Sequence, residues 1–111
     1  MPDYNRIAAK IMQLQYGIFK DCYNCGSPSK HFPVNLYFET ADLRFYIACA
    51  FNKWSVDYTK NMNISARTEF THIKGIKNQT EAINVIKHLL SGEKFKLTHD
   101  GKCVAEEPNK T

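Results

Sequence analysis

Apolar residues recur every three or four positions across residues 4–20, which is the spacing of an amphipathic helix. Asp3 is the candidate N-cap, and Gly17 weakens the last turns because glycine costs about 1 kcal/mol relative to alanine inside a helix. A second apolar stripe lies beside the first, so we expect this helix either to be buried on more than one side or to meet a partner. The first stripe is Tyr4, Ile7, Ala8, Ile11, Leu14 and Ile18, and the second is Met12, Tyr16 and Phe19.

The middle of the chain, residues 33–73, alternates between apolar and polar positions, which is the pattern of β-strands. Four segments carry this alternation in succession: VNLYFE, LRFYIACAF, WSVDYT and ISARTEFTHI. Short connections join them, so the pattern predicts a meander of four antiparallel strands.

The same alternation assigns each strand residue to one of two sheet faces. We expect the apolar face to form the core, and the other face to be polar with a few aromatic rings. The predicted core face is Val34, Leu36, Phe38, Phe45, Ile47, Cys49, Phe51, Trp54, Val56, Tyr58, Ile64, Ala66 and Phe70. The predicted outer face is Asn35, Tyr37, Glu39, Arg44, Tyr46, Ala48, Ser55, Asp57, Ser65, Arg67, Glu69 and Thr71.

A second helix is predicted in the segment KNQTEAINVIKHLLSG. Asn78 or Thr80 can cap its start, and Gly92 suits the left-handed residue that ends a helix. Its apolar face is predicted to be Ala82, Ile83, Val85, Ile86, Leu89 and Leu90.

A short hairpin is predicted after this helix, because Asp100 and Gly101 stand between two short alternating segments in FKLTHDGKCVA. The predicted fold class is therefore α+β. A four-stranded antiparallel meander is preceded by one helix, followed by a second helix, and closed by the C-terminal β-hairpin. We expect residues 1–105 to form one domain and residues 106–111 to be a frayed tail.

The composition suits a folded chain, with 43% hydrophobic and 13% aromatic residues. No apolar run approaches the ~20 residues that span a bilayer, and the N-terminal segment lacks the apolar stretch of a signal peptide. We therefore expect an intracellular, cytoplasmic protein with no membrane partner. In that compartment the four cysteines are expected to be reduced thiols or metal ligands.

The net charge of +4 is distributed unevenly. Residues 60–102 carry eight basic and four acidic side chains, whereas residues 1–59 carry six and five. A mild basic bias of this kind permits binding to nucleic acid or to another anionic partner. Lysine outnumbers arginine twelve to three, which weakens the case for bidentate recognition of bases or phosphates.

Cys22 and Cys25 form a C-x-x-C-G turn in the segment DCYNCGSPSKHFP. Over these five residues the chain resembles the knuckle of zinc ribbons and related zinc modules. His99 and Cys103 lie across the predicted hairpin turn, so a zinc ion held by both pairs would tie the loop after the first helix to the hairpin. His31 can replace His99 as the histidine ligand. The alternative that all four cysteines are free thiols stays open. Cys49 is expected to be a small buried thiol on the core face. A redox pair is not favoured, because the cysteines follow a helix rather than a strand of a βαβ unit. The predicted ligand set is Cys22, Cys25, His99 and Cys103.

Aromatic and arginine side chains share the predicted outer face of the sheet. Proteins that bind single-stranded nucleic acid on antiparallel sheets stack bases on such rings and hold phosphates with cations. Two other interpretations stay open: an ordinary sheet surface, since tyrosine favours strands, or a face covered by the N-terminal helix. The predicted contacts are Tyr37, Arg44, Tyr46 and Arg67 on the sheet, with Lys74 and Lys77 beside it.

We therefore expect a small, non-enzymatic accessory protein that binds single-stranded or structured nucleic acid through this face. The alternative is a protein-interaction module, an adaptor or inhibitor, that docks a protein partner or a second copy through Met12, Tyr16 and Phe19. The sequence holds no glycine-rich phosphate loop, nucleophile elbow or metalloprotease helix motif, so enzymatic activity is not expected. No cofactor is expected either, with zinc the one exception left open.

Overall fold

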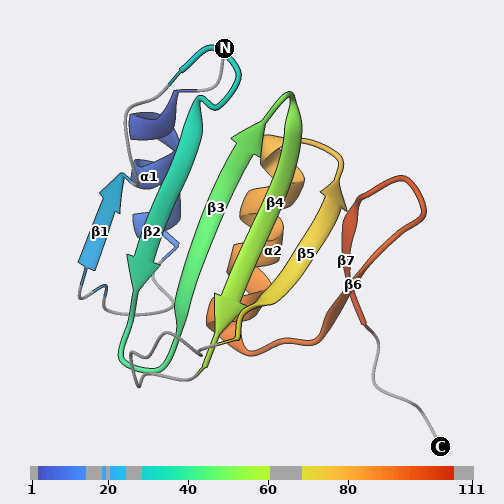
Figure 1. Cartoon of the computed structure of the whole chain (residues 1–111). Coiled ribbons are helices and arrows are strands. Elements are labelled where there is room, and N and C mark those ends of the chain that lie inside the picture. The colour runs from blue at the N-terminus through green and yellow to red at the C-terminus, as the bar shows by residue number, and fades with distance from the viewer. Residues whose placement is uncertain (1–2, 15–18, 20, 25–28, 61–68, 107–111) are drawn as a thin grey trace, which may run out of the picture.

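A computed structural model describes residues 3–14, 19, 21–24, 29–60 and 69–106 of the chain. Its centre is a five-stranded antiparallel sheet in the order β1-β2-β3-β4-β5 (Figure 1). The strands are β1 (Asp21–Asn24), β2 (Val34–Glu39), β3 (Arg44–Ala50), β4 (Lys53–Thr59) and β5 (Thr71–Ile76). The predicted α+β meander is confirmed, and β1 adds a strand where the sequence indicated a cysteine loop.

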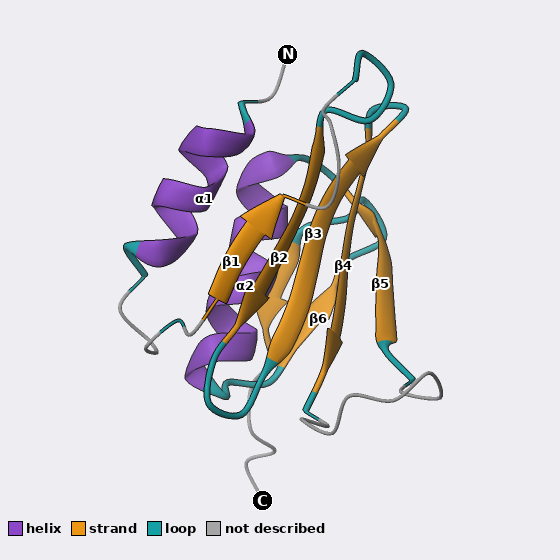
Figure 2. Cartoon of the chain, turned by 60° about the vertical axis from the view of Figure 1, so that its left-hand side comes forward, coloured by secondary structure: helices purple, strands orange, loops and turns teal. Residues whose placement is uncertain are grey.

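Helices α1 (Tyr4–Met12) and α2 (Gln79–Ser91) cover the same face of the sheet (Figure 2). Their predicted caps are confirmed. The Asp3 side chain accepts a hydrogen bond from the Asn5 backbone N–H, and the Asn78 side chain accepts one from that of Glu81. Gly92 ends α2 in the left-handed conformation, with φ of 77°. Among the helices that the structure describes, none is long and apolar enough to cross a bilayer.

Helix α1 is shorter than the apolar spacing predicts. It ends at Met12, with Gln13 as its C-cap, whereas the predicted helix continued to residue 20. Residues 15–18 and 20 lie outside the described chain, so the predicted contribution of Gly17 to the last turns does too.

The core lies between the helices and the inner face of the sheet. Two buried residues of α1 and three of α2 pack against the alternating apolar residues of the strands, as the two periodicities predict. The largest fully buried side chains are Phe38, Phe45, Ile7, Ile11, Ile47, Ile86, Val34, Val56 and Val85.

The last strand of the sheet departs from the prediction by one residue of register. The described strand β5 begins at Thr71, and His72 pairs with Asp57. The predicted strand positions 64–68, with Ile64, Ala66, Ser65 and Arg67, lie outside the described residues. Phe70 therefore falls on the outer face and not in the core. The alternation was misleading because a bulge at Gly75, with φ of 75°, lets Ile73 and Ile76 both reach the inner face from positions three apart.

The turn between β3 and β4 corrects a second core assignment. Phe51 and Asn52 form a two-residue turn with φ of 52° and 63°, the pair of left-handed conformations that a type I′ hairpin requires. Asparagine and glycine adopt this conformation readily, but for a bulky ring it costs about 1–3 kcal/mol. Phe51 is 69% exposed, and its ring stacks on that of His31 at a centroid distance of 5.2 Å.

The predicted C-terminal hairpin is confirmed as β6 (Phe95–Leu97) and β7 (Cys103–Ala105). Gly101 in its turn has φ of 85°, as the Asp-Gly signal implies. The Gly101 carbonyl oxygen accepts a hydrogen bond of 2.9 Å from the Lys77 backbone N–H. The hairpin turn is thereby attached to the connection between β5 and α2.

Candidate functional site

The outer face of the sheet, opposite the helices, carries a row of side chains that crosses the four strands β2 to β5. Tyr37 in β2 pairs with Tyr46 in β3, Tyr46 with Asp57 in β4, and Asp57 with His72 in β5. This placement confirms that Tyr37 and Tyr46 share a face that the helices leave uncovered. Arg44 lies two residues before Tyr46 on the same strand and so on the same face.

Four of the side chains on this face form one cluster, which we call the outer cluster: Tyr37, Arg44, Tyr46 and Phe70. The Tyr46 ring lies 4.9 Å from the Tyr37 ring and 5.5 Å from the Phe70 ring, measured between centroids. The Arg44 guanidinium carbon lies 5.8 Å from the centroid of Tyr37 and 5.6 Å from that of Phe70. These are cation–π distances, so the cluster joins aromatic surface to a positive charge.

Tyr37 and Arg44 form the buried layer of the outer cluster, with 3% and 9% of their surfaces exposed. Arg44 Nε donates a 2.9 Å hydrogen bond to the Tyr37 hydroxyl, which donates to Glu39 Oε1 at 2.8 Å. The ion pair between Arg44 Nε and Glu39 Oε1 is 4.0 Å long. Tyr37 therefore positions Arg44 and does not itself present a ring for stacking.

Arg44 keeps an unused donor. Its Nη1 is buried and has no hydrogen-bond partner, the one such side-chain atom found in the described part of the chain. A buried guanidinium nitrogen without an acceptor is costly, and a nearby phosphate or carboxylate oxygen would relieve that cost. The charge is only partly compensated by Glu39, and it lies 5.6 Å from the centroid of the partly exposed Phe70 ring.

Burial raises the pKa of Tyr37 to about 12 from its ordinary value of 10.0, an effect that the Arg44 hydrogen bond opposes in part. Below pH 10 both the folded and the unfolded chain hold this proton. Between pH 10 and 12 only the folded chain does, so stability should fall as the pH rises, by about 2–3 kcal/mol. Urea unfolding across this range should show a shallower fall for Tyr37→Phe, and equal slopes in both proteins would contradict the burial argument.

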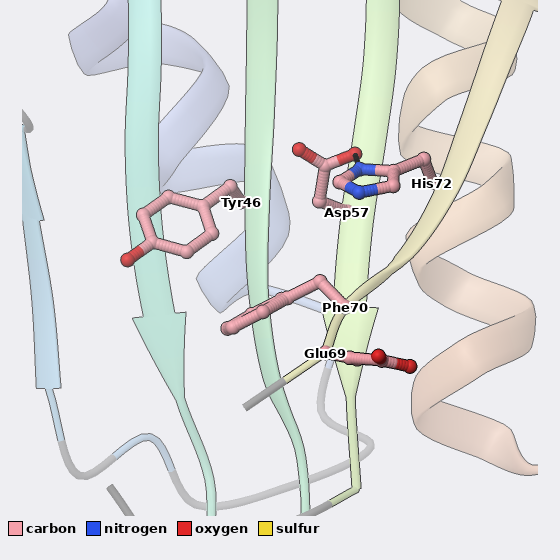
Figure 3. A pocket seen from close by; sticks show the side chains of 5 residues that line it. All are labelled: Tyr46, Asp57, Glu69, Phe70 and His72. Carbon is pink, nitrogen blue, oxygen red and sulfur yellow. Dashed lines mark hydrogen bonds and ion pairs between the residues drawn. The ribbon is translucent and has the colours of Figure 1, made fainter. Parts of the chain in front are cut away.

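A shallow pocket of about 490 Å³ lies beside the outer cluster, lined by Tyr46, Asp57, Glu69, Phe70 and His72 (Figure 3). His72 Nδ1 lies 2.8 Å from Asp57 Oδ1. The tautomer that donates this hydrogen bond leaves Nε2 as a proton acceptor. The Tyr46 hydroxyl points toward β2, away from the pair, and the described lining includes no serine, threonine or cysteine. The pocket offers hydrogen-bonding groups and flat aromatic surface.

No protein-family model matches this chain, and neither the curated proteins nor the solved structures contain a significant match.

The remaining predicted nucleic-acid contacts are placed only in part. Lys74 in β5 and Lys77 just after it are exposed, near the end of the sheet where the β3–β4 turn lies. Arg67 lies outside the described residues. The structure thus groups Tyr37, Arg44 and Tyr46 closely and sets the two lysines apart from them.

The predicted four-ligand zinc site is not assembled. Cys22 lies in β1 at one edge of the sheet, and Cys103 lies in the hairpin beyond β5 (Figure 1). Four strand spacings of about 4.8 Å separate β1 from β5, whereas a shared zinc ion lies about 2.3 Å from each sulfur. His99 is exposed while Cys103 is buried, and Cys25 lies outside the described residues. No three His, Cys, Asp or Glu side chains in the described ranges gather closely enough to hold a metal ion.

The predicted docking stripe of the N-terminal helix is divided by the fold. Met12 is 50% exposed, but Phe19 packs on the core, with ring centroids 5.5 Å from Phe38 and 6.5 Å from Phe45. Tyr16 lies outside the described residues. Phe19 is therefore partly buried against the core and does not belong to an exposed docking stripe.

Cys103 and His88 form a second pair of chemically capable side chains, with Sγ 3.6 Å from Nδ1. Burial raises the pKa of the Cys103 thiol to about 11, with a smaller contribution from the Glu81 charge. His88 Nδ1 also lies 2.8 Å from the Asn84 carbonyl oxygen, so its N–H is already engaged. A thiol that stays protonated at neutral pH is a poor nucleophile, and this pair is a structural contact.

Sequence reasoning missed three residues of the site: Asp57, Phe70 and His72. Asp57 was assigned to the outer face but not linked to a partner, because its partner depends on the register of β5. Phe70 was assigned to the core for the same reason. The signal that could have found them is the glycine at position 75, since an isolated glycine inside a strand pattern indicates a bulge and hence a change of register.

Proposed function

We propose that this protein binds single-stranded nucleic acid on the outer face of its sheet. The observation that carries the proposal is the outer cluster, in which the partly exposed rings of Tyr46 and Phe70 adjoin each other. Phe70 also contacts the buried Arg44, whose Nη1 has no acceptor among the described residues. Bases stack on the rings of Tyr46 and Phe70, and the Arg44 charge attracts the adjoining phosphate.

The shape of the face favours single strands over duplexes. A base must leave its stack before it can lie on a protein ring, and only loops and single strands present bases in that way. The pocket beside Tyr46 adds hydrogen-bonding groups from Asp57 and His72, which a base edge could contact. The positive net charge of the chain supports association with a polyanion.

Fluorescence anisotropy with labelled single-stranded DNA and RNA of mixed sequence tests this proposal. We expect binding to weaken as salt is raised, with a logarithmic slope of about −2 if three phosphates are neutralised. Tyr46→Ala should reduce affinity about tenfold, since one stacked base contributes about 1–3 kcal/mol.

Tyr46→Phe is the matched control, because it keeps the ring and removes only the hydroxyl. It should retain the wild-type affinity. If the wild-type protein binds neither DNA nor RNA at low salt, or if Tyr46→Ala binds as tightly as the wild type, the outer face is not a nucleic-acid site.

A further inference from the structure

Three separate segments meet at one end of the sheet. Cys49 pairs with both Val34 and Trp54, and Trp54 in turn pairs with Ile76. The segment that precedes β2, the β3–β4 turn and the end of β5 therefore lie at the same end, which is the upper end in Figure 1. We call this region the turn end of the sheet.

The turn end is basic. Residues 29–35 and 50–56 contain no acidic side chain. The opposite end of the sheet carries charges of both signs: Glu39, Asp42 and Glu69 are acidic, and Arg44 and Lys60 are basic. Asp100, in the hairpin turn that packs on residue 77, lies 4.0 Å from Lys102, which offsets its charge. The exposed basic residues of the turn end are Lys30, Lys53, Lys74 and Lys77, with His31 beside them.

At this end the fold does not require a phenylalanine at position 51. The residue is 69% exposed and occupies a left-handed conformation that asparagine or glycine would adopt more easily. Its ring lies nearly parallel to that of His31, at 15°, and its N–H donates a 2.7 Å hydrogen bond to the His31 carbonyl oxygen. A ring held flat by a second ring and left open to solvent is suited to stacking on a third planar group.

We propose that the turn end is a second contact region for the same single strand, in which a base stacks on Phe51 and the surrounding lysines hold phosphates. This inference rests on the proposed function and adds the path that the bound strand takes, from the outer cluster along β3 to the turn end. Phe51 lies five residue steps beyond Tyr46 along β3 and into its turn, which at about 3.3 Å a step is about 17 Å. Between them β3 itself presents only the small side chains of Ala48 and Ala50 on the outer face, so a strand of about four or five nucleotides can follow β3.

The geometry favours nucleic acid over a lipid surface as the occupant. A side chain that inserts into a bilayer projects from its loop, whereas the ring of Phe51 is stacked against His31. Planar aromatic surface combined with lysines matches the alternation of bases and phosphates in a single strand.

Phe51→Asn separates a binding role from a structural one. Asparagine tolerates the left-handed conformation, so the melting temperature should rise by about 4 °C. Affinity for a labelled single strand of about twelve nucleotides should nevertheless fall about tenfold, the loss expected for one stacked base. Affinity for inorganic polyphosphate, which has no bases, should stay within twofold of the wild-type value.

Met12→Asn is the matched control, since it removes an exposed apolar side chain from α1 and should leave oligonucleotide affinity unchanged. If Phe51→Asn binds the oligonucleotide like the wild type while Tyr46→Ala binds more weakly, the turn end is not a contact region and the outer face alone remains. If Phe51→Asn loses polyphosphate affinity equally, or loses binding to phosphatidylserine vesicles and not to oligonucleotides, stacking on a base is excluded. If the wild type binds no oligonucleotide, the proposed function and this inference fail together.

Discussion

Replacing Gly101 by alanine should lower the free energy of unfolding by about 3 kcal/mol. Gly101 is buried in the hairpin turn with φ of 85°, a conformation that L side chains rarely adopt. A Cβ atom there would lie 2.7 Å from the Lys77 backbone nitrogen and 3.2 Å from its Cα, and would also collide with the Gly75 carbonyl oxygen. All three neighbours are backbone atoms, so no side chain can move aside to make room.

The measurement is urea unfolding followed by the fluorescence of Trp54, which is buried in the core. Gly92→Ala is the matched control. Gly92 has φ of 77°, but no atom lies within 4 Å of a Cβ built on it, so this variant carries the conformational strain without the collision. It should cost about 1 kcal/mol. Similar losses in the two variants would show that the hairpin turn is not packed tightly against the β5–α2 connection.

The Gly101 contact also bears on what the sequence could predict about the fold. The Asp-Gly pair predicted the turn, because turn type depends on local backbone preferences. That the turn would lie against residues 75–77 was not predictable from any local pattern. The predictions of the helix caps, at Asp3 and Asn78, were correct for the same reason, because a cap depends on residues close in sequence. The predicted inner faces of β2, β3 and β4 were correct because alternation along a strand is also a local pattern.

Errors arose where tertiary contacts override a local pattern. The apolar period of α1 continues past Met12, yet Phe19 packs on Phe38 and Phe45 and the helix stops. Phe51 continues the apolar alternation of β3, but the tight turn to β4 takes it out of the strand. In both cases the hydrophobic pattern showed that the residue is apolar, but it did not show whether the residue belongs to the regular element before it.

At the candidate site, too, the local pattern predicted which face a residue lies on but not its tertiary contacts. Alternation placed Tyr37, Arg44 and Tyr46 on one face, and this is where they lie. It could not reveal that Tyr37 and Arg44 would be buried there, because Phe70, which contacts Arg44, comes from the chain just before another strand. A one-residue difference in the register of β5 thus changes the site from an open pair of tyrosines to a layered cluster with Tyr46 and Phe70 outermost.

Phe45→Ala should be the most destabilising of the substitutions considered, at about 3–5 kcal/mol. Phe45 is fully buried in β3, and its ring stacks on Phe38 at 5.1 Å and meets the edge of Phe19 at 6.5 Å. Truncation removes one of the two rings of the sheet that contact Phe19. The neighbouring strands cannot close the cavity, because their hydrogen-bonded register holds them apart.

Urea unfolding again provides the measurement, with Phe32→Ala as the control for loss of a ring at a surface position. Phe32 is 40% exposed and should cost about 1 kcal/mol or less. If Phe45→Ala is too unstable to study, Phe45→Leu should lose about 1–2 kcal/mol and remain folded. Because Phe45 lies between Arg44 and Tyr46 but faces the opposite side of the sheet, the leucine variant should keep wild-type oligonucleotide affinity. A large loss of affinity in a folded Phe45→Leu protein would mean that the core and the outer cluster do not behave as separate layers.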